Sequence, residues 1–272
     1  MSKKVYVITG GTSGIGLAFL KRLTSDSLVF LAYRNEAKLP SFDEFDAKII
    51  PFYLDYSKSD TIKPAIDFVK SRCTKIDMLL NGAGCVVAGP IEKISIDELR
   101  RQFEVNVFGH LELTQGLIDY LENGKIINIS SMSSFGVFPF IAPYSASKRC
   151  LDMFFNSLLL ETKQNVKVIS IKPGVIATPL WNKSIDENLK YIQNCDGYEK
   201  EMEYLIKNAK RHTDDGLNVD KVVDLILKIE KNPNPKLSYL IGRDAIFASY
   251  FAKLPQKILN KLIKFGLKLK IK

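Results

Sequence analysis

The segment "KVYVITGGTSGIGLAFLKRL", residues 4–23, decides the fold. Its first part, "KVYVI" at 4–8, is an apolar run with the β-branched residues typical of a strand. A turn with Gly10, Gly14 and Gly16 follows, and "LAFLKRL" continues as a helix. Such a turn lets backbone N–H groups approach a pyrophosphate, to which the helix N-terminus adds a partial positive charge. Alone it is as often only a turn, so its interpretation depends on the rest of the chain.

Six further apolar runs follow, with helical segments between them. They are "LVFLAY" (28–33), "KIIPFYL" (48–54), "IDMLLN" (76–81), "KIINIS" (125–130), "VKVISI" (166–171) and "LSYLI" (237–241). Because polar and apolar residues do not alternate within these runs, strands covered on both faces are expected. The alternation of strand and helix predicts an α/β fold: a Rossmann-like, doubly wound parallel sheet of about seven strands with helices on both faces.

Length and composition favour a single domain over residues 1–272. Hydrophobic residues make up 46% of the 272, enough for one large core, and charged residues make up 25%, near the globular average. The segment 95–121 is expected to be helical, because Ser95 and Glu98 have capping-box spacing and apolar residues recur every three or four positions. The only linker-like stretch, "KNPNPK" (231–236), is expected to be a loop before the last strand.

The positive charge is concentrated at the C-terminus. The net charge is +9, and seven lysines with no Asp or Glu lie within 253–272. Nucleic-acid-binding proteins more often spread Lys and Arg over a face with aromatic residues between them, so no nucleic-acid partner is predicted. The apolar residues that recur among these lysines are Ile258, Leu262, Phe265 and Leu269. They predict a basic amphipathic helix in a tail of about 245–272, which either packs on protein or makes peripheral contact with an anionic membrane.

The cysteines suggest neither a metal site nor disulfides. Cys73, Cys85, Cys150 and Cys195 have no paired spacing and no neighbouring histidine, so no metal is predicted and reduced thiols are expected. The start "MSKKVYVITG" has too few apolar residues for a signal peptide, and no window has the ~18 apolar residues of a membrane span. A cytoplasmic protein is predicted, membrane-associated only if the tail binds lipid.

The end of the second strand bears on the choice of cofactor. In dinucleotide-binding folds a carboxylate there accepts hydrogen bonds from the ribose hydroxyls of NAD. Here the segment reads "LAYRNEAK" (31–38), which places Arg34 where it can pair with a 2′-phosphate. NADP(H) is therefore predicted in preference to NAD(H). NAD(H) stays an alternative, because the carboxylate of Glu36 lies only two residues after Arg34. The alternative is that Arg34 is a solvated loop charge.

The segment "APYSASKRC" (142–150) places Tyr144 and Lys148 on one face of a helix, at i and i+4. A phenol exchanges protons poorly at neutral pH, but a nearby ammonium group and a nicotinamide cation would both favour its phenolate. Tyr144 could then transfer a proton to a carbonyl oxygen. Ser131 follows the strand "KIINIS", at the edge where a doubly wound sheet binds ligands, so its hydroxyl is predicted to hydrogen-bond the substrate oxygen. In isolation, Tyr–Lys pairs at this spacing are usually ordinary helix-surface residues.

These motifs occur together and in a characteristic order. The order is the glycine turn, "NGAG" (81–84), Asn106 in "FEVNVFG", Ser131, the pair Tyr144 and Lys148, and "KPGVIATP" (172–179). Over roughly residues 4–180 they resemble the short-chain dehydrogenase/reductase family. The segments "QFEVNVFGHLELTQ" and "LIGRDAIFASYFAKLPQKILNKLIKFGL" are most similar to its hydroxysteroid and retinol dehydrogenase branch.

The resemblance implies a role for each matching residue. Tyr144 is implied as the catalytic acid or base, and Lys148 as the residue that binds the nicotinamide ribose and lowers the pKa of Tyr144. Ser131 is implied to position the substrate oxygen, and Asn106 to hold a water in a proton relay. Cofactor contacts, besides those of Arg34, Tyr144 and Lys148, are implied for Gly10, Thr12, Ser13, Gly14, Ile15, Gly16, Asp55, Asn81, Ala83, Gly84, Pro173, Gly174, Ile176 and Thr178.

The segment 180–216 is where this family determines substrate choice. It mixes aromatic and apolar residues with many charges, which fits a helical lid with an apolar underside or an ordinary surface helix. A small-molecule alcohol or carbonyl, lipophilic by the branch resemblance, is therefore the expected substrate. The family also implies a homodimer or homotetramer formed through the helices around 97–120 and 143–164.

The leading prediction is an NADP-dependent oxidoreductase that interconverts a secondary alcohol and a ketone or aldehyde. One alternative is an NADP-binding redox sensor without turnover, which would be favoured had Tyr144 or Lys148 been replaced. Another is a sugar-nucleotide-modifying relative, which usually needs a larger substrate domain than the 124 residues that follow Lys148 (272 minus 148).

Overall fold

The computed structural model describes residues 3–193 and 195–270. Seven strands form one sheet, in which every neighbouring pair is parallel and the order is β3-β2-β1-β4-β5-β6-β7. The strands are β1 (Lys4–Thr9), β2 (Ser27–Tyr33), β3 (Lys48–Tyr53), β4 (Met78–Asn81), β5 (Lys125–Ile129), β6 (Lys167–Pro173) and β7 (Ser238–Ile241). Each lies within a few residues of a predicted run, so the predicted α/β doubly wound sheet is confirmed.

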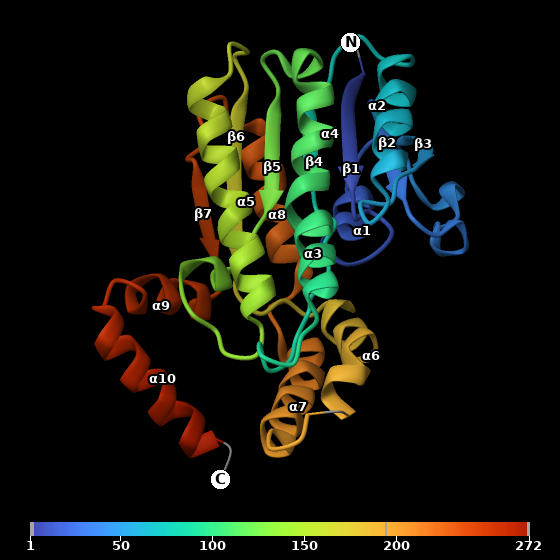
Figure 1. Ribbon diagram of the computed structural model, residues 1–272. Helices are drawn as coiled ribbons and strands as arrows, with labels where there is room; N and C mark the ends of the chain where they lie inside the picture. The colour runs from blue at the N-terminus through green and yellow to red at the C-terminus, as the bar shows by residue number, and fades with distance from the viewer. Residues whose placement is uncertain (1–2, 194, 271–272) are drawn as a thin grey trace.

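Helices cover both faces of this sheet (Figure 1). The helices are α1 (Gly14–Leu20), α2 (Ile62–Lys70), α3 (Ile96–Phe103), α4 (Gly109–Leu117), α5 (Ala142–Glu161), α6 (Leu180–Gln193), α7 (Glu199–Asp215), α8 (Val219–Lys231), α9 (Arg243–Phe251) and α10 (Gln256–Lys270). One hydrophobic cluster packs α2, α4 and α5 on one face, and a second packs α1 and α8 on the other. The strands read as continuous apolar runs because both of their faces are buried.

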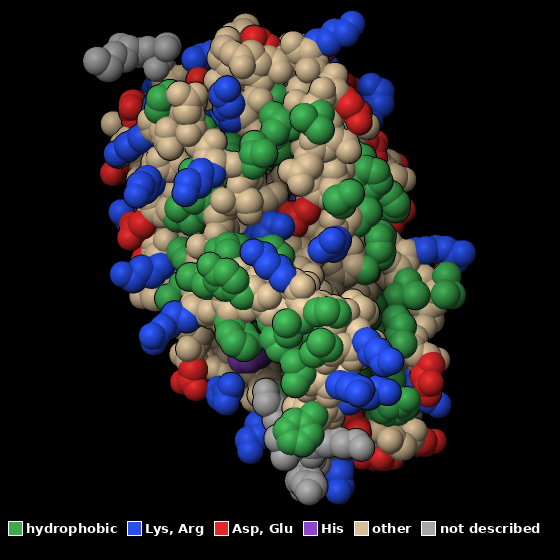
Figure 2. All heavy atoms as spheres, turned by 90° about the vertical axis from the view of Figure 1, so that its left-hand side faces the viewer, with side chains coloured by type: hydrophobic (Ala, Val, Ile, Leu, Met, Phe, Trp, Pro, Cys, Tyr) green, Lys and Arg blue, Asp and Glu red, His purple; other side chains and the backbone are tan. Residues whose placement is uncertain are grey.

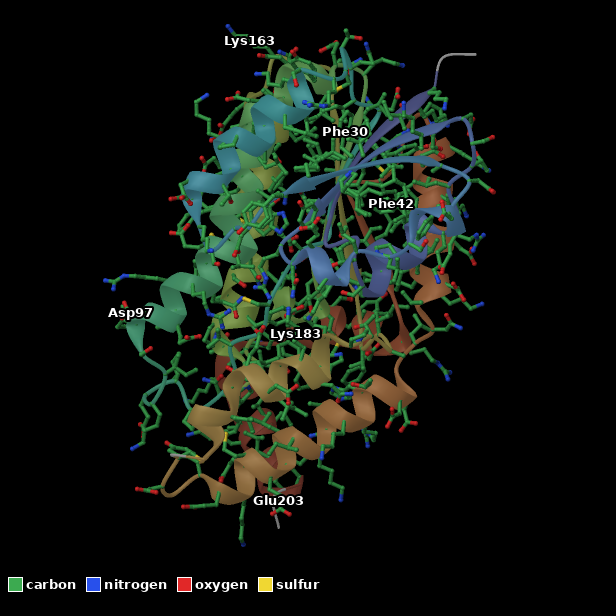
Figure 3. The ribbon with its side chains drawn as sticks, turned by 90° about the vertical axis from the view of Figure 1, so that its right-hand side faces the viewer. Phe30, Phe42, Asp97, Lys163, Lys183 and Glu203 are labelled. Carbon is green, nitrogen blue, oxygen red and sulfur yellow. The ribbon has the colours of Figure 1, made fainter. Side chains whose placement is uncertain are left out.

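Four helices lie beyond the edge at which the strands end: α6 and α7 under one part of the sheet, α9 and α10 under another (Figure 1). Figure 3 shows Lys183 on α6 and Glu203 on α7 at this end, with Lys163 at the opposite end. The carboxyl ends of parallel strands meet at one edge, where doubly wound sheets bind their ligands, and these helices lie beside that edge. Among the described residues no helix is both long and apolar enough to span a membrane.

The predicted helix over 95–121 forms, but it is not continuous. Ser95 caps its start by accepting a hydrogen bond from the backbone N–H of Glu98 at 3.3 Å. Between α3 and α4 the backbone makes one π-helical turn over Glu104–Phe108. Such turns insert an extra residue and rotate the side chains that follow. This turn contains Asn106, which is completely buried.

Candidate functional site

The glycine turn between β1 and α1 is held against two other loops. Gly10 has a φ of +70°, and a Cβ atom there would lie 2.6 Å from the backbone N of Ala83. A Cβ on Gly16 would lie 2.5 Å from the Gly10 carbonyl oxygen, so only glycine fits this packing. A Cβ on Gly14 would be in ordinary contact with Thr178, at 3.5 Å. The predicted cofactor segments at 10–16, 81–84 and 173–178 therefore meet at one place.

Three of the predicted site residues are neighbours beside this turn. A Cβ on Gly84 would lie 3.4 Å from Asn106 Oδ1 and 3.7 Å from Lys148 Nζ. Asn106 Nδ2 donates to the Cys85 carbonyl oxygen at 3.1 Å, and its Oδ1 accepts from the Cys85 N–H at 2.9 Å. Lys148 Nζ donates to the Ile129 carbonyl oxygen at 2.8 Å. The π-helical turn thus places Asn106 close to Lys148. Sequence periodicity does not reveal such a turn.

Tyr144 lies one helical turn before Lys148 on α5 and is buried, with Lys148 Nζ 5.8 Å from the centre of its ring. Its phenol lies beside the hydroxyl of Ser131, the half-buried residue that caps the short 3₁₀ helix Met132–Phe135. Burial raises the pKa of Tyr144 to about 12, against the opposing effect of the nearby Ser131 hydroxyl. This direction is opposite to the predicted lowering, because removal from water outweighs the more distant ammonium group. At neutral pH the phenol is protonated.

Lys148 is buried as well, and burial lowers its pKa to about 8. Asp152, one further turn along α5, opposes this shift by its negative charge. Lys172 on β6 approaches within 2.7 Å of the Asp152 carboxylate, in an ion pair of which both side chains are largely buried. Lys148 therefore remains mostly protonated at neutral pH, but its pKa is close enough to neutral for the ammonium group to give up a proton.

Two predicted cofactor residues lie farther along the same edge. Arg34 follows β2, is exposed, and forms no ion pair with any other described residue. Asp55 follows β3 and is 7% exposed, and its Oδ1 accepts from the Ser57 N–H at 3.0 Å and from the Ser57 hydroxyl at 2.7 Å. A free guanidinium beside a glycine turn suits a phosphorylated dinucleotide.

The segment 173–178, which contains four predicted cofactor contacts, is held in place by a residue close to the C-terminus. Asp244 on α9 accepts from the Val175 N–H at 2.6 Å, and a Cβ on Gly174 would collide with its carboxylate. Pro173 and Ile176 are buried, while Thr178 faces Gly14. Two buried polar atoms nearby, Asn81 Oδ1 and Ser130 Oγ, have no hydrogen-bond partner within the described residues. Buried polar atoms without a partner, close to loops that are rich in glycine, fit a polar ligand such as a nicotinamide dinucleotide.

Comparison with known proteins adds the family. The model of the family described as short chain dehydrogenase matches residues 4–189. The chain belongs to the short-chain dehydrogenase family. It is therefore an oxidoreductase that acts on alcohol or carbonyl groups, as the order of its motifs predicts.

Among its relatives, the NADPH-dependent 3-dehydrocapnine reductase of Ornithobacterium rhinotracheale is 29% identical over 96% of both chains. The 3-ketodihydrosphingosine reductase of Bacteroides thetaiotaomicron is 27% identical over 97% of this chain and 98% of its own. A short-chain dehydrogenase/reductase from Burkholderia phymatum, solved with NAD, superimposes with a TM-score of 0.78 at 21% identity, covering 96% and 95% of the two chains. This last likeness shows the fold alone.

Three polar residues of this short-chain dehydrogenase shape the site and were not predicted from the sequence: Thr9, His110 and Asn128. Thr9 Oγ1 accepts from the N–H groups of Gly82 and Ala83, at 3.2 and 3.3 Å. His110 is completely buried with its Nε2 2.9 Å from the Ala83 carbonyl oxygen, and burial, with a smaller effect of the Lys148 charge, lowers its pKa to about 3. Asn128 Oδ1 accepts from Nδ2 of the predicted Asn81 at 2.8 Å. The only signal for these residues in the sequence is a polar side chain within or beside an apolar run.

The predicted lid segment, 180–216, forms α6 and α7. Its position is fixed by Asn188, a completely buried residue on α6. Asn188 Nδ2 donates to the carbonyl oxygens of Val86 and Ser184, at 2.7 and 2.6 Å, and its Oδ1 accepts from the Ala88 N–H at 3.0 Å. Trp181 and His212 join the two helices edge to face, with ring centres 5.3 Å apart. α6 is thus attached to the loop that follows the segment 81–84.

Proposed function

We propose that the protein is an NADP-dependent oxidoreductase that interconverts a secondary alcohol and a ketone or aldehyde on a lipophilic substrate. The observation that carries the proposal is the buried Tyr144 phenol, which lies beside the Ser131 hydroxyl and one helical turn from a buried Lys148. These three side chains surround a position where an oxygen atom can accept two hydrogen bonds and gain a proton. The turnover reaction is favoured over a redox sensor because none of them is replaced.

The residues of the chain would divide the work as follows. When bound, the nicotinamide supplies or accepts the hydride. The Ser131 hydroxyl and the Tyr144 phenol hold the carbonyl oxygen, and Tyr144, which is protonated at neutral pH, donates its proton to that oxygen. Lys148 keeps a positive charge beside the phenol and, with Asn106, holds the path by which Tyr144 recovers a proton. In the alcohol-to-ketone direction the same groups accept the proton.

NADP(H) is the proposed cofactor, in preference to NAD(H). Arg34 supports this choice, because an exposed guanidinium after β2 is available to a 2′-phosphate and is not neutralised by a described carboxylate. The relative named as an NADPH-dependent reductase supports it as well. We assign the cofactor contacts to the glycine turn (10–16), Asp55, the segment 81–84, Tyr144, Lys148 and the loop 173–178.

The test is cofactor consumption over a panel of lipophilic ketones and aldehydes, with the native chain and Tyr144→Phe. We expect turnover with NADPH, and a decrease of kcat by ~10²- to 10⁴-fold in the variant, the usual contribution of a general acid. Asn156→Ala, an exposed change on the same helix, is the control. Binding of NADPH without turnover on any substrate would instead support a sensor.

We also propose that the chain is a single cytoplasmic domain that assembles as a homodimer or homotetramer through α3–α4 and α5. These helices expose large apolar side chains: Phe108, Met153, Phe154 and Leu160, the last 86% exposed. Light scattering after size-exclusion chromatography should give a multiple of 30.7 kDa, and Leu160→Glu should reduce it. A monomeric native chain would refute this assembly.

The tail is proposed to contact an anionic membrane surface. Ile258, Leu262 and Phe265 of α10 are 47%, 43% and 62% exposed, whereas Leu259 is 4% exposed and packs on the protein. Leu269, the fourth residue of the predicted stripe, lies outside the residues whose side chains are described. Lysines flank the exposed stripe and no carboxylate follows Lys253, so its charge complements anionic lipid. Truncation before Lys253 should abolish sedimentation with phosphatidylserine vesicles, and retained binding would contradict the proposal.

A further inference from the structure

An apolar cavity of about 390 Å³ lies between α9, α10, the segment 132–139 and Tyr204 of α7. Its volume is within the range of small-molecule sites. Among the described residues that line it, only Asp244 is charged, and that carboxylate is already engaged by the N–H groups of Val175 and Ala245, at 2.6 and 2.9 Å. The cavity therefore offers a ligand almost nothing but hydrocarbon. In Figure 2 the surrounding face shows hydrophobic side chains and lysines intermixed over α9 and α10.

The walls of the cavity adjoin the reaction site at two points. Met132 lines the cavity and directly follows Ser131, whose hydroxyl lies beside the Tyr144 phenol. Asp244 lines it and holds Val175 in the loop proposed to contact the nicotinamide. A substrate with its carbonyl at Tyr144 therefore has the cavity as the space next to it.

One wall of the cavity is α10 from Leu259 to Leu267, which are eight positions and thus ~12 Å apart along the helix axis. Small residues keep it open: a Cβ on Gly266 would meet no atom within 4 Å, and one on Gly136 would only touch the Cβ of Ala252 at 4.0 Å. If a methylene group occupies about the ~30 Å³ that a water molecule does, the volume holds on the order of ten of them.

We propose that this cavity binds an unbranched hydrocarbon chain of about ten carbons, so that the substrate is a long-chain ketone. The inference rests on the proposed function for the position of the carbonyl, but the cavity itself does not. A hydrocarbon chain, which has neither charges nor hydrogen-bonding groups, matches this lining. The sole carboxylate among the described lining residues is already hydrogen-bonded to backbone N–H groups. Phosphorylated or sugar substrates would leave charges or hydroxyl groups unpaired against it.

The first experiment measures NADPH-dependent reduction of methyl ketones from 2-butanone to 2-dodecanone. We expect kcat/KM to rise about fourfold for each buried methylene group and to level off near ten carbons. The filling variants Gly266→Phe and Ala248→Phe should remove this rise while leaving the reduction of 2-butanone unchanged. Asn260→Phe, at an exposed position of α10 outside the cavity, is the matched control and should behave as the native chain. Equal rises in native and filled chains would overturn the proposal.

The second experiment separates this inference from the proposed function. Calorimetric titration of the native chain with 1-decanol and 1-butanol measures chain binding without any turnover. Binding of 1-decanol at least tenfold tighter, lost in Gly266→Phe, supports the cavity even if no ketone is reduced. Absence of that preference overturns it even if short ketones are reduced. A rigid steroid ketone that is reduced better than every alkanone, with loss only of the steroid reaction in the filled variants, would also overturn it.

Discussion

Two regions meet at the same edge of the sheet and differ in almost every property. Around the glycine turn, Asn106 and His110 are completely buried, and each is bonded to backbone atoms of the loop 83–85. Around α9 and α10, Phe247 and Phe265 are 68% and 62% exposed beside a cavity with a hydrocarbon lining. The region around the glycine turn holds polar atoms at fixed positions, whereas the region around α9 and α10 encloses an apolar space.

The difference fits the role proposed for each region. Proton transfer requires atoms held at fixed distances, and buried polar groups are stable only when they are paired, so the first region is interlocked. Hydrophobic binding is not directional and requires only area and space, so the second region can be open. Stability and chemistry should therefore respond to changes in the first region, and substrate range to changes in the second.

The largest effect is expected from acid acting on His110. Unfolded histidine binds a proton below pH ~6.5, but burial lowers the pKa of folded His110 to about 3. Between these values the unfolded state binds more protons, so the free energy of unfolding falls as the pH falls, by ~1.4 kcal/mol per unit for this group. His110→Gln cannot be protonated and should lose less stability between pH 7 and 5, by ~2 kcal/mol. Urea unfolding at both pH values measures this, and parallel losses would show that His110 is not buried in its neutral form.

The next effect concerns the junction of the two regions. Asn188→Ala removes the partners of the Val86 carbonyl and the Ala88 N–H, and an unsatisfied buried group costs ~1–3 kcal/mol. We expect a lower free energy of unfolding and a higher KM for the substrate, with kcat less affected. Asn182→Ala, exposed on the same helix, is the control and should change neither. An unchanged KM would mean that α6 does not border the substrate.

A smaller effect is expected at the outer end of the cofactor region. Arg34→Ala should raise the KM for NADPH about tenfold and leave that for NADH unchanged, since a charge-assisted contact contributes ~1.5–3 kcal/mol. Lys38→Ala, a nearby exposed cation, serves for comparison. Equal changes for the two cofactors would remove the argument for NADP.

The smallest effect is expected on the exposed stripe of α10. Phe265→Ser should change the free energy of unfolding by less than ~0.5 kcal/mol, as surface substitutions do, yet weaken binding to phosphatidylserine vesicles. A destabilisation above ~1 kcal/mol would show that α10 is packed as tightly as the glycine turn, and it would contradict the difference drawn between the two regions.

The sequence by itself determined the seven strands and the helices between them, and it singled out Ser131, Tyr144 and Lys148 as the candidate reaction residues that the structure brings together. Local patterns suffice here, because apolar runs specify strands, and i,i+4 spacing places the Tyr–Lys pair on one face. The glycine turn was equally local, since Gly10, Gly14 and Gly16 all lie within the seven residues 10–16.

Only the tertiary structure decided which other residues complete the site. Asn188 meets residues 100 and 102 positions away, and Asp244 meets Val175 69 positions away, so no local pattern announces either contact. The π turn that delivers Asn106 lies inside a stretch that reads as an ordinary helix. In α10, periodicity predicted an amphipathic helix but could not choose its buried side, because apolar residues lie on two sides of it. Leu259 packs inward while Ile258 stays exposed, since the packing of α9 and the segment 132–139 determines which side is covered.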